Sequence, residues 1–195
     1  MSTGTKVPHP LARAAAADLV GLLEGYCLKV EVAGSIRRGC PEVSDVELVA
    51  VPKVDQVPCP PGEDLFAAGA LVDVNLLHRR LDDLVPRYLK AGQKYRAFMW
   101  PLKDGGRQVG EIQVDLSMAP ADYFGLIFAI RTGSAGFCRH LMASFGRQSL
   151  RSDGGKVYHR VGNEPFDEPI ATPTEDDVFR LAGLKWIPPA ERNWD

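Results

Sequence analysis

The stretch Gly34-Ser35-Ile36-Arg37-Arg38-Gly39, followed by Ser44-Asp45-Val46-Glu47-Leu48-Val49-Ala50-Val51, decides the fold and directs the functional analysis. A turn with two glycines, a serine and paired arginines leads within a few residues into two acids on a strongly apolar run. Since strand side chains alternate with a period of two, Asp45 and Glu47 project from one face. The apolar residues between and after them then fill the opposite face of a buried strand.

This arrangement favours phosphate chemistry. Mg²⁺ prefers carboxylate oxygens and is normally held by one or two carboxylates plus substrate phosphates. The Gly34-Ser35 turn offers backbone N–H groups and a hydroxyl to an anion, and Arg38 offers a fork of donors to phosphate. For the acid pair alone, a solvated polar hairpin is an equal alternative. The full spacing favours a phosphate cradle beside metal ligands.

Length and charge bound the possibilities. The 195 residues, 45% hydrophobic and 25% charged, are typical of a globular protein of one domain or two small ones. The net charge is −2 and the sequence pI is about 6.1. A protein that grips nucleic acid over a long footprint is usually basic, so any nucleic-acid contact is expected to be local and salt-dependent.

Cysteine spacing and hydropathy indicate the compartment. Cys27, Cys40, Cys59 and Cys138 show no C-x-x-C spacing, which argues against zinc and fits reduced thiols. The N-terminus does not resemble a signal peptide, and no apolar run approaches the roughly 20 residues of a membrane helix. We therefore expect a soluble, intracellular, cytoplasmic monomer.

The periodicity of the chain predicts alternating helices, strands and turns. In order, we expect a helix over 11–24, a strand over 28–32, a surface loop over 52–62, a short helix within 76–85, antiparallel strands over 95–99 and 109–116 around a turn at 101–107, helices over 123–130 and 134–146, a hairpin over 149–159, and a helix that begins after Thr174.

A third acid extends the carboxylate pair. Asp115 lies on the polar face of the strand over 109–116, because Ile112, Val114 and Leu116 alternate with it. A third carboxylate could complete a two-metal site, in which one ion activates an attacking hydroxyl and one binds a triphosphate. A solvated acid at a sheet edge is the alternative.

The C-terminal part is more basic. Its cations are either a solvated face or contacts to a nucleic-acid backbone. They are Arg131, Arg139, Arg147, Arg151, Lys156 and Arg160.

Together these motifs resemble the X family of DNA polymerases. The resemblance covers roughly residues 10–195. It rests on the Gly-Ser motif with Asp45-x-Glu47, on Asp115 after Gly110-Glu111-Ile112-Gln113-Val114, on Arg131-Thr132-Gly133-Ser134, and on the ending from Thr174 to Arg192. It implies an α+β fold, with a nucleotidyltransferase palm of mainly antiparallel mixed sheet over 1–120 and a small helical and hairpin thumb over 121–195.

The resemblance also implies residue roles. Asp45, Glu47 and Asp115 would be catalytic and hold two Mg²⁺ ions, with Mn²⁺ as a possible substitute. The nucleotide-binding set would be Gly34, Ser35, Arg38, Ser44, Ile130, Arg131, Thr132, Gly133, Ser134, Phe137 and Cys138. The expected DNA contacts are Gln113, Arg139, His140, Arg147, Arg151 and Lys156.

Several positions depart from the family pattern. Glu47 replaces the usual second aspartate, Ile130 and Arg131 replace aromatic residues, and Cys138 replaces an asparagine that reads the base. Only an arm and one helix precede Gly34, so we expect no lyase domain and no helix-hairpin-helix fingers.

Three functions compete. The first is a minimal DNA-directed DNA polymerase that adds deoxynucleotides from dNTPs to a primer 3′ end, in gapped DNA or at broken ends. The second is a small-molecule or RNA nucleotidyltransferase of the same superfamily, which the acidic overall balance favours. The third is a non-catalytic DNA-end-binding module, against which the three intact carboxylates argue.

Overall fold

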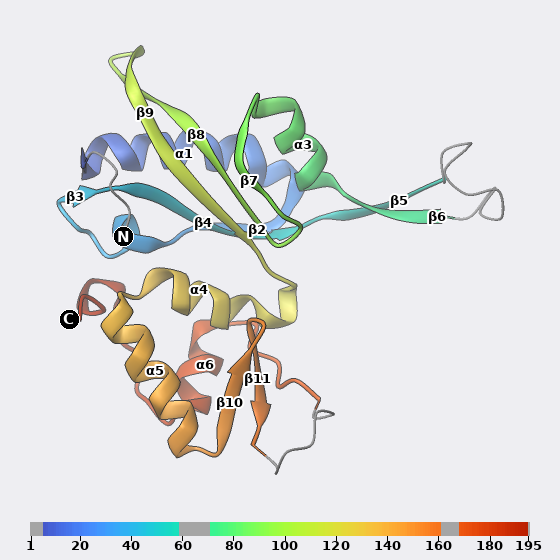
Figure 1. Cartoon of the computed structure of the whole chain (residues 1–195), viewed down its shortest axis with the longest axis vertical. Coiled ribbons are helices and arrows are strands. Elements are labelled where there is room, and N and C mark those ends of the chain that lie inside the picture. Colours follow the sequence, from blue (N-terminus) through green and yellow to red (C-terminus); the bar gives the residue numbers. More distant parts are fainter. Residues whose placement is uncertain (1–5, 59–70, 161–167, 195) are drawn as a thin grey trace.

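The structure is a computed structural model that describes residues 6–58, 71–160 and 168–194. It is an α+β protein, and Figure 1 shows a twisted sheet with α1 on one side and α4 on the other. Within the described ranges the strands are β1 Val7–Pro8, β2 Cys27–Val32, β3 Glu42–Val43, β4 Asp45–Pro52, β5 Val54–Pro58, β6 Leu71–Asn75, β7 Tyr88–Ala91, β8 Tyr95–Asp104, β9 Arg107–Met118, β10 Leu150–Asp153 and β11 Lys156–His159. The helices there are α1 His9–Leu23, α2 Gly34–Arg37, α3 Leu76–Leu84, α4 Phe124–Thr132, α5 Ala135–Arg147 and α6 Glu175–Leu181. In these ranges no helix is long and apolar enough to cross a membrane.

The central sheet has the strand order β2-β4-β9-β8-β7. The predicted strands over 28–32, 95–99 and 109–116 all belong to it, and β8 pairs with β9 antiparallel as expected. The central strand β9 instead runs parallel to its other neighbour, β4. The first residue of β4, Asp45, pairs with Gln113 in the middle of β9, which brings Asp45 and Glu47 to the level of Asp115.

Helix α1 covers one face of the sheet. Pro10 lies in its first turn, where a missing N–H costs nothing, and its buried alanines allow close approach to the strands. Leu19 and Leu23 pack there against β4 residues such as Leu48, all of them fully buried. The predicted helix is confirmed, although it ends at Leu23 and a 3₁₀ turn replaces its last residues.

Helix α4 covers part of the opposite face. Phe124 and Phe128 pack against Ala33, Val49 and Val51 in a second, smaller apolar cluster. Because Asp45 and Glu47 share the parity of Val49 along β4, the two acids emerge on this same face, beside α4 rather than α1.

The C-terminal region, residues 124–160 and 168–194, has a hydrophobic core of its own. Helix α5 contributes Phe137, Leu141 and Phe145 to this core, and α6 contributes Phe179. Helix α4 and the β10–β11 hairpin supply further apolar residues. Ser134 caps α5 as predicted, since its Oγ accepts from Phe137 N at 3.3 Å. The separate core explains why the region forms a distinct body below the sheet in Figure 1.

The predicted surface loop over 52–62 is wrong for its first part. Val54–Pro58 forms β5, which pairs antiparallel with β6 in a ribbon that projects from the sheet (Figure 1). The strand is stabilised by its pairing with β6, and Pro58 stands at its end, where proline is tolerated. Residues 59–62 lie outside the described residues. The Gly34-Ser35 turn is a single helical turn, α2.

Candidate functional site

Three predicted acids meet on the α4 side of the sheet. In the parallel pairing of β4 with β9, Glu47 lies directly beside Asp115, and Asp45 lies beside Gln113. Asp45, Glu47 and Asp115 are each half-buried. The sheet thus places two carboxylates side by side on neighbouring strands and a third two residues before Glu47 along β4.

This proximity changes the electrostatics of the acids. Burial, followed by the negative charges of Asp45 and Asp115, raises the pKa of Glu47 to about 7. Burial and the charge of Asp115 also raise the pKa of Asp45 above its usual range. Neighbouring negative charges make each carboxyl group harder to ionise. A bound cation would offset this repulsion and stabilise the ionised carboxylates.

The residues fit Mg²⁺ in donor chemistry, because carboxylate oxygens are its preferred ligands. In the described part of the chain, however, no group of three His, Cys, Asp or Glu side chains converges closely enough to hold one ion. Asp115 Oδ1 instead accepts a hydrogen bond from Gln113 Nε2 at 2.8 Å. Glu47 lies against Gly34, where a Cβ would be only 2.2 Å from Glu47 Oε2. A bound cation would favour a closer approach of the three carboxylates, because it would offset their mutual repulsion.

A polar pocket of about 420 Å³ lies at the N-terminal end of β4. Its walls include six residues of the predicted nucleotide-binding and metal-binding sets, of which the last follows α4: Ser35, Arg38, Ser44, Asp45, Glu47 and Gly133. Ser35 Oγ is buried and has no hydrogen-bond partner among the described residues. Such an orphan hydroxyl fits a cradle for a phosphate oxygen, which would supply the missing partner.

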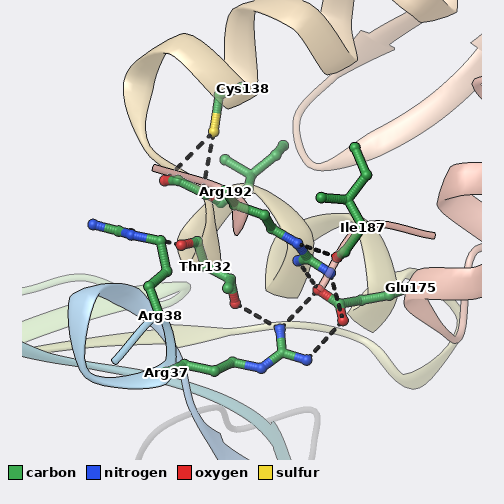
Figure 2. A network of polar contacts seen from close by, with 9 residues as sticks. Arg37, Arg38, Thr132, Cys138, Glu175, Ile187 and Arg192 are labelled. Carbon is green, nitrogen blue, oxygen red and sulfur yellow. Dashed lines mark hydrogen bonds and ion pairs between the residues drawn. The ribbon is translucent and has the colours of Figure 1, made fainter. Parts of the chain in front are cut away.

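Arg38 is engaged by the C-terminal region. Its Nη1 donates to Thr132 O at 2.6 Å and its Nε donates to Asn193 Oδ1 at 2.7 Å. Figure 2 shows Arg38 and Arg37 reaching from α2 toward Thr132. Arg38, which was predicted to bind phosphate, therefore also connects the end of α2 to the last residue of α4.

Glu175 is the centre of a buried ionic network (Figure 2). Arg37 donates to both carboxylate oxygens, at 2.8 Å and 2.7 Å, and Arg192 donates to both from the other side. Arg37 also donates to Thr132 Oγ1 at 2.8 Å. Burial disfavours the charged Glu175, but the hydrogen bonds from Arg37 and Arg192 outweigh it and lower the pKa of Glu175. The network connects α2, the helical turn between β2 and β3, to the C-terminal region.

The other predicted nucleotide-binding residues have structural contacts. Phe137 is fully buried between Phe179 and Trp194, so its side chain is not available to a ligand. Ser134 Oγ is occupied by the α5 cap and by Trp194, and Cys138 Sγ donates to Ile130 O at 3.2 Å. Phe137 is therefore part of the core, whereas Ser134 and Cys138 remain partly exposed.

The predicted DNA contacts are distributed over β9, α5 and the β10–β11 hairpin. Arg139 and Arg147 are exposed on α5, and the His140 ring packs on Trp194. The two predicted contacts on the β10–β11 hairpin lie over aromatic rings, Arg151 over Tyr158 and Lys156 over Tyr123. Gln113 on β9 donates a hydrogen bond to Asp115.

Sequence reasoning missed three site residues. Burial, followed by hydrogen bonding to Asp115, raises the pKa of Tyr95 to about 12, which places this phenol beside the acids. Glu175 lies in the helix expected after Thr174 and Arg192 in the chain ending, but the sequence predicted no site role for either residue. The one sequence signal for Arg192 was the nearby Trp186, Ile187 and Trp194, because a cation that is buried with such residues is normally paired with an acid.

The family model of the DNA polymerase beta thumb matches residues 128–193, which begin within α4 and include α5, the β10–β11 hairpin and α6. This part of the chain is therefore similar to the thumb of a DNA polymerase.

Proposed function

We propose that this chain is a minimal DNA-directed DNA polymerase that transfers deoxynucleotides to a primer 3′ end, in short gaps or at broken ends. One observation carries the proposal. The row of Asp45, Glu47 and Asp115 adjoins a pocket with an orphan Ser35 hydroxyl, in a chain whose residues 128–193 are similar to a polymerase thumb. The sheet would serve as the palm, over residues 1–120, and residues 121–195 as the thumb.

In the proposed reaction the primer 3′-oxygen forms a bond to the α-phosphorus of a dNTP, and the bond to the β-phosphate breaks to release pyrophosphate. Asp45, Glu47 and Asp115 would hold two Mg²⁺ ions, or Mn²⁺. When bound, these ions would make the 3′-hydroxyl more acidic and stabilise charge on the leaving pyrophosphate.

The protein's own groups orient the reactants. Ser35 Oγ and the backbone of the Gly34 turn would donate to the triphosphate, with Ser44 and Gly133 forming the remaining wall. Asp115, whose carboxylate is held by Gln113, would take the proton of the 3′-hydroxyl. Such fixed donors and acceptors accelerate transfer by positioning and by stabilising charge.

The test is primer extension on a labelled gapped primer–template, with each dNTP supplied singly and with Mg²⁺, Mn²⁺ or EDTA. We expect template-matched addition that EDTA abolishes. Asp115→Ala should lower the rate by about 100-fold or more, since charged groups at the reacting centre contribute on this scale. Asp18→Ala is the matched control, because Asp18 lies exposed on α1. Extension by Asp115→Ala at the parent rate would refute the mechanism.

The same assay separates the alternatives. Absent extension with intact binding to the gapped DNA would indicate a DNA-end-binding module. Absence of both would indicate a nucleotidyltransferase with another acceptor, which the net charge of −2 favours.

A further inference from the structure

Strand β2 forms one edge of the central sheet. It pairs antiparallel with β4, and no other strand in the described part of the chain pairs with it. The N–H and C=O groups on its outer side are therefore available to another strand. An edge of this kind is a template for pairing with a second chain.

The apolar side chains of β2 extend this edge. Leu28 is 69% exposed, the largest exposed fraction among the large apolar residues that the structure describes. Val30 and Val32 pair with Ala50 and Leu48 of β4, so they lie on the face of the sheet that α1 covers, and both remain partly exposed. The edge thus presents apolar surface together with backbone donors and acceptors.

The charged side chains of β2 lie on the opposite face, beside α4. Lys29 and Glu31 pair there with Val51 and Val49 of β4. Neither charged residue forms an ion pair within the described residues. A pocket of about 430 Å³, lined by Lys29 and Trp186 among others, leaves this face of β2 accessible. One cation and one anion, two positions apart, therefore lack partners of opposite charge.

A second copy of β2 provides both partners in one register. In an antiparallel pairing centred on Val30, Lys29 lies opposite the partner's Glu31, and Glu31 lies opposite the partner's Lys29. Leu28 then lies opposite the partner's Val32. Residues directly opposite each other in such a pair interact, and unlike charges placed this way attract. Because the pairing has twofold symmetry, both charge pairs form together.

The other edge of the sheet does not have this property. Strand β7 presents Lys90 but no acidic residue. Two copies of β7 would therefore gain no attraction between unlike charges. Self-complementary charge distinguishes β2 from β7 and indicates a second copy of the chain as its partner.

We propose that two copies of this chain associate through antiparallel pairing of their β2 strands, which joins the two five-stranded sheets into one continuous sheet. The dimer differs from the monomer expected from the sequence, which does not show that β2 is an edge strand. Since each copy contributes one short strand, the contact is small and the dimer dissociates readily. The association is independent of the proposed polymerase reaction, because other elements line the phosphate pocket.

Analytical ultracentrifugation of the full chain, over about 1 μM to 1 mM protein, tests the proposal. We expect a reversible monomer–dimer equilibrium. Lys29→Glu and Glu31→Lys should each raise the dimer Kd about tenfold or more, because like charges then face each other in both pairs. The double variant exchanges the signs and restores the attraction, so its Kd should return to within about threefold of the wild-type value. Arg13→Glu, an equal change of charge at an exposed position on α1, is the matched control.

Three results would overturn the proposal. The wild-type protein could stay monomeric over the whole range, the single variants could leave the dimer unchanged, or the double variant could fail to restore it. Thermal melts of each variant separate loss of pairing from loss of the fold. Amide hydrogen exchange gives an independent measurement, since the β2 amides should exchange more slowly as the dimer forms, whereas those of β7 should not change.

Discussion

Replacing Glu175 with glutamine tests the ionic network that joins the sheet to the C-terminal region. The substitution retains the size of the side chain and one carbonyl acceptor but removes the negative charge. Two guanidinium groups, those of Arg37 and Arg192, then face a neutral amide. The Arg192 side chain is fully buried, so water cannot replace the lost partner.

Breaking a buried ion pair by removing one partner costs about 3–5 kcal/mol, since an uncompensated charge remains inside the protein. For a chain of this size that corresponds to roughly 6–20 °C in Tm. A surface pair offers the comparison. Arg180 and Asp177 form an ion pair in which the arginine side chain is 76% exposed, and such pairs contribute about 0–1 kcal/mol.

Urea denaturation followed by circular dichroism, together with thermal melts, would measure both variants at pH 7. We expect Glu175→Gln to lose several times more free energy of unfolding than Arg180→Gln. The wild-type advantage should also shrink as pH falls through the lowered pKa of Glu175, because the protonated acid no longer pairs with the arginines. Equal losses of less than about 1 kcal/mol in the two variants would refute the view that this network holds the two parts together.

Three further predictions concern the phosphate pocket and the turn after α4. The pKa of Glu47, raised from 4.5 to about 7, means that the folded state keeps a proton that the unfolded chain releases. In metal-free buffer the free energy of unfolding should therefore fall between pH 4.5 and 7, and urea titrations of Glu47→Gln should show a flatter profile. Ser35→Ala removes an unpartnered hydroxyl, so calorimetric titration with a dNTP should show weaker binding while Tm does not fall. Gly133→Ala should destabilise by about 1–3 kcal/mol, because the new Cβ would lie 2.1 Å from Phe137 Cδ1, whereas Gly146→Ala in α5, with open space around it, should stabilise by about 0.5–1 kcal/mol in the same melts.

The local elements were largely predictable because their signals are local. The alternation of apolar residues around Asp115, the Ser134 cap and the leucines of α3 each depend on neighbours within a few residues. The failure at β5 has the same explanation. Val54–Pro58 becomes a strand through pairing with β6, and no feature of the proline-rich stretch itself reveals that partner.

The site was predictable in part. Strand periodicity put Asp45 and Glu47 on one face, but the parallel register that sets Glu47 beside Asp115 joins residues far apart in the chain. The role of Arg37 could not be derived either, because Glu175 lies 138 positions away and its charge gives no indication of its partner. Long-range pairing, which a single sequence does not display, decides these contacts.

The segment Arg131-Thr132-Gly133, which ends α4 and begins the turn to α5, unites these observations. The charge of Arg131 lowers the pKa of Glu47 against the effect of burial, Thr132 accepts from Arg37 and Arg38, and Gly133 lines the phosphate pocket. The same segment leads into α5, where Phe137 is buried in the core of the C-terminal region. A displacement of that core would therefore move a wall of the pocket and the supports of α2 together. In this fold the geometry of the candidate phosphate pocket depends on the packing of the C-terminal region as directly as on the sheet that carries the acids.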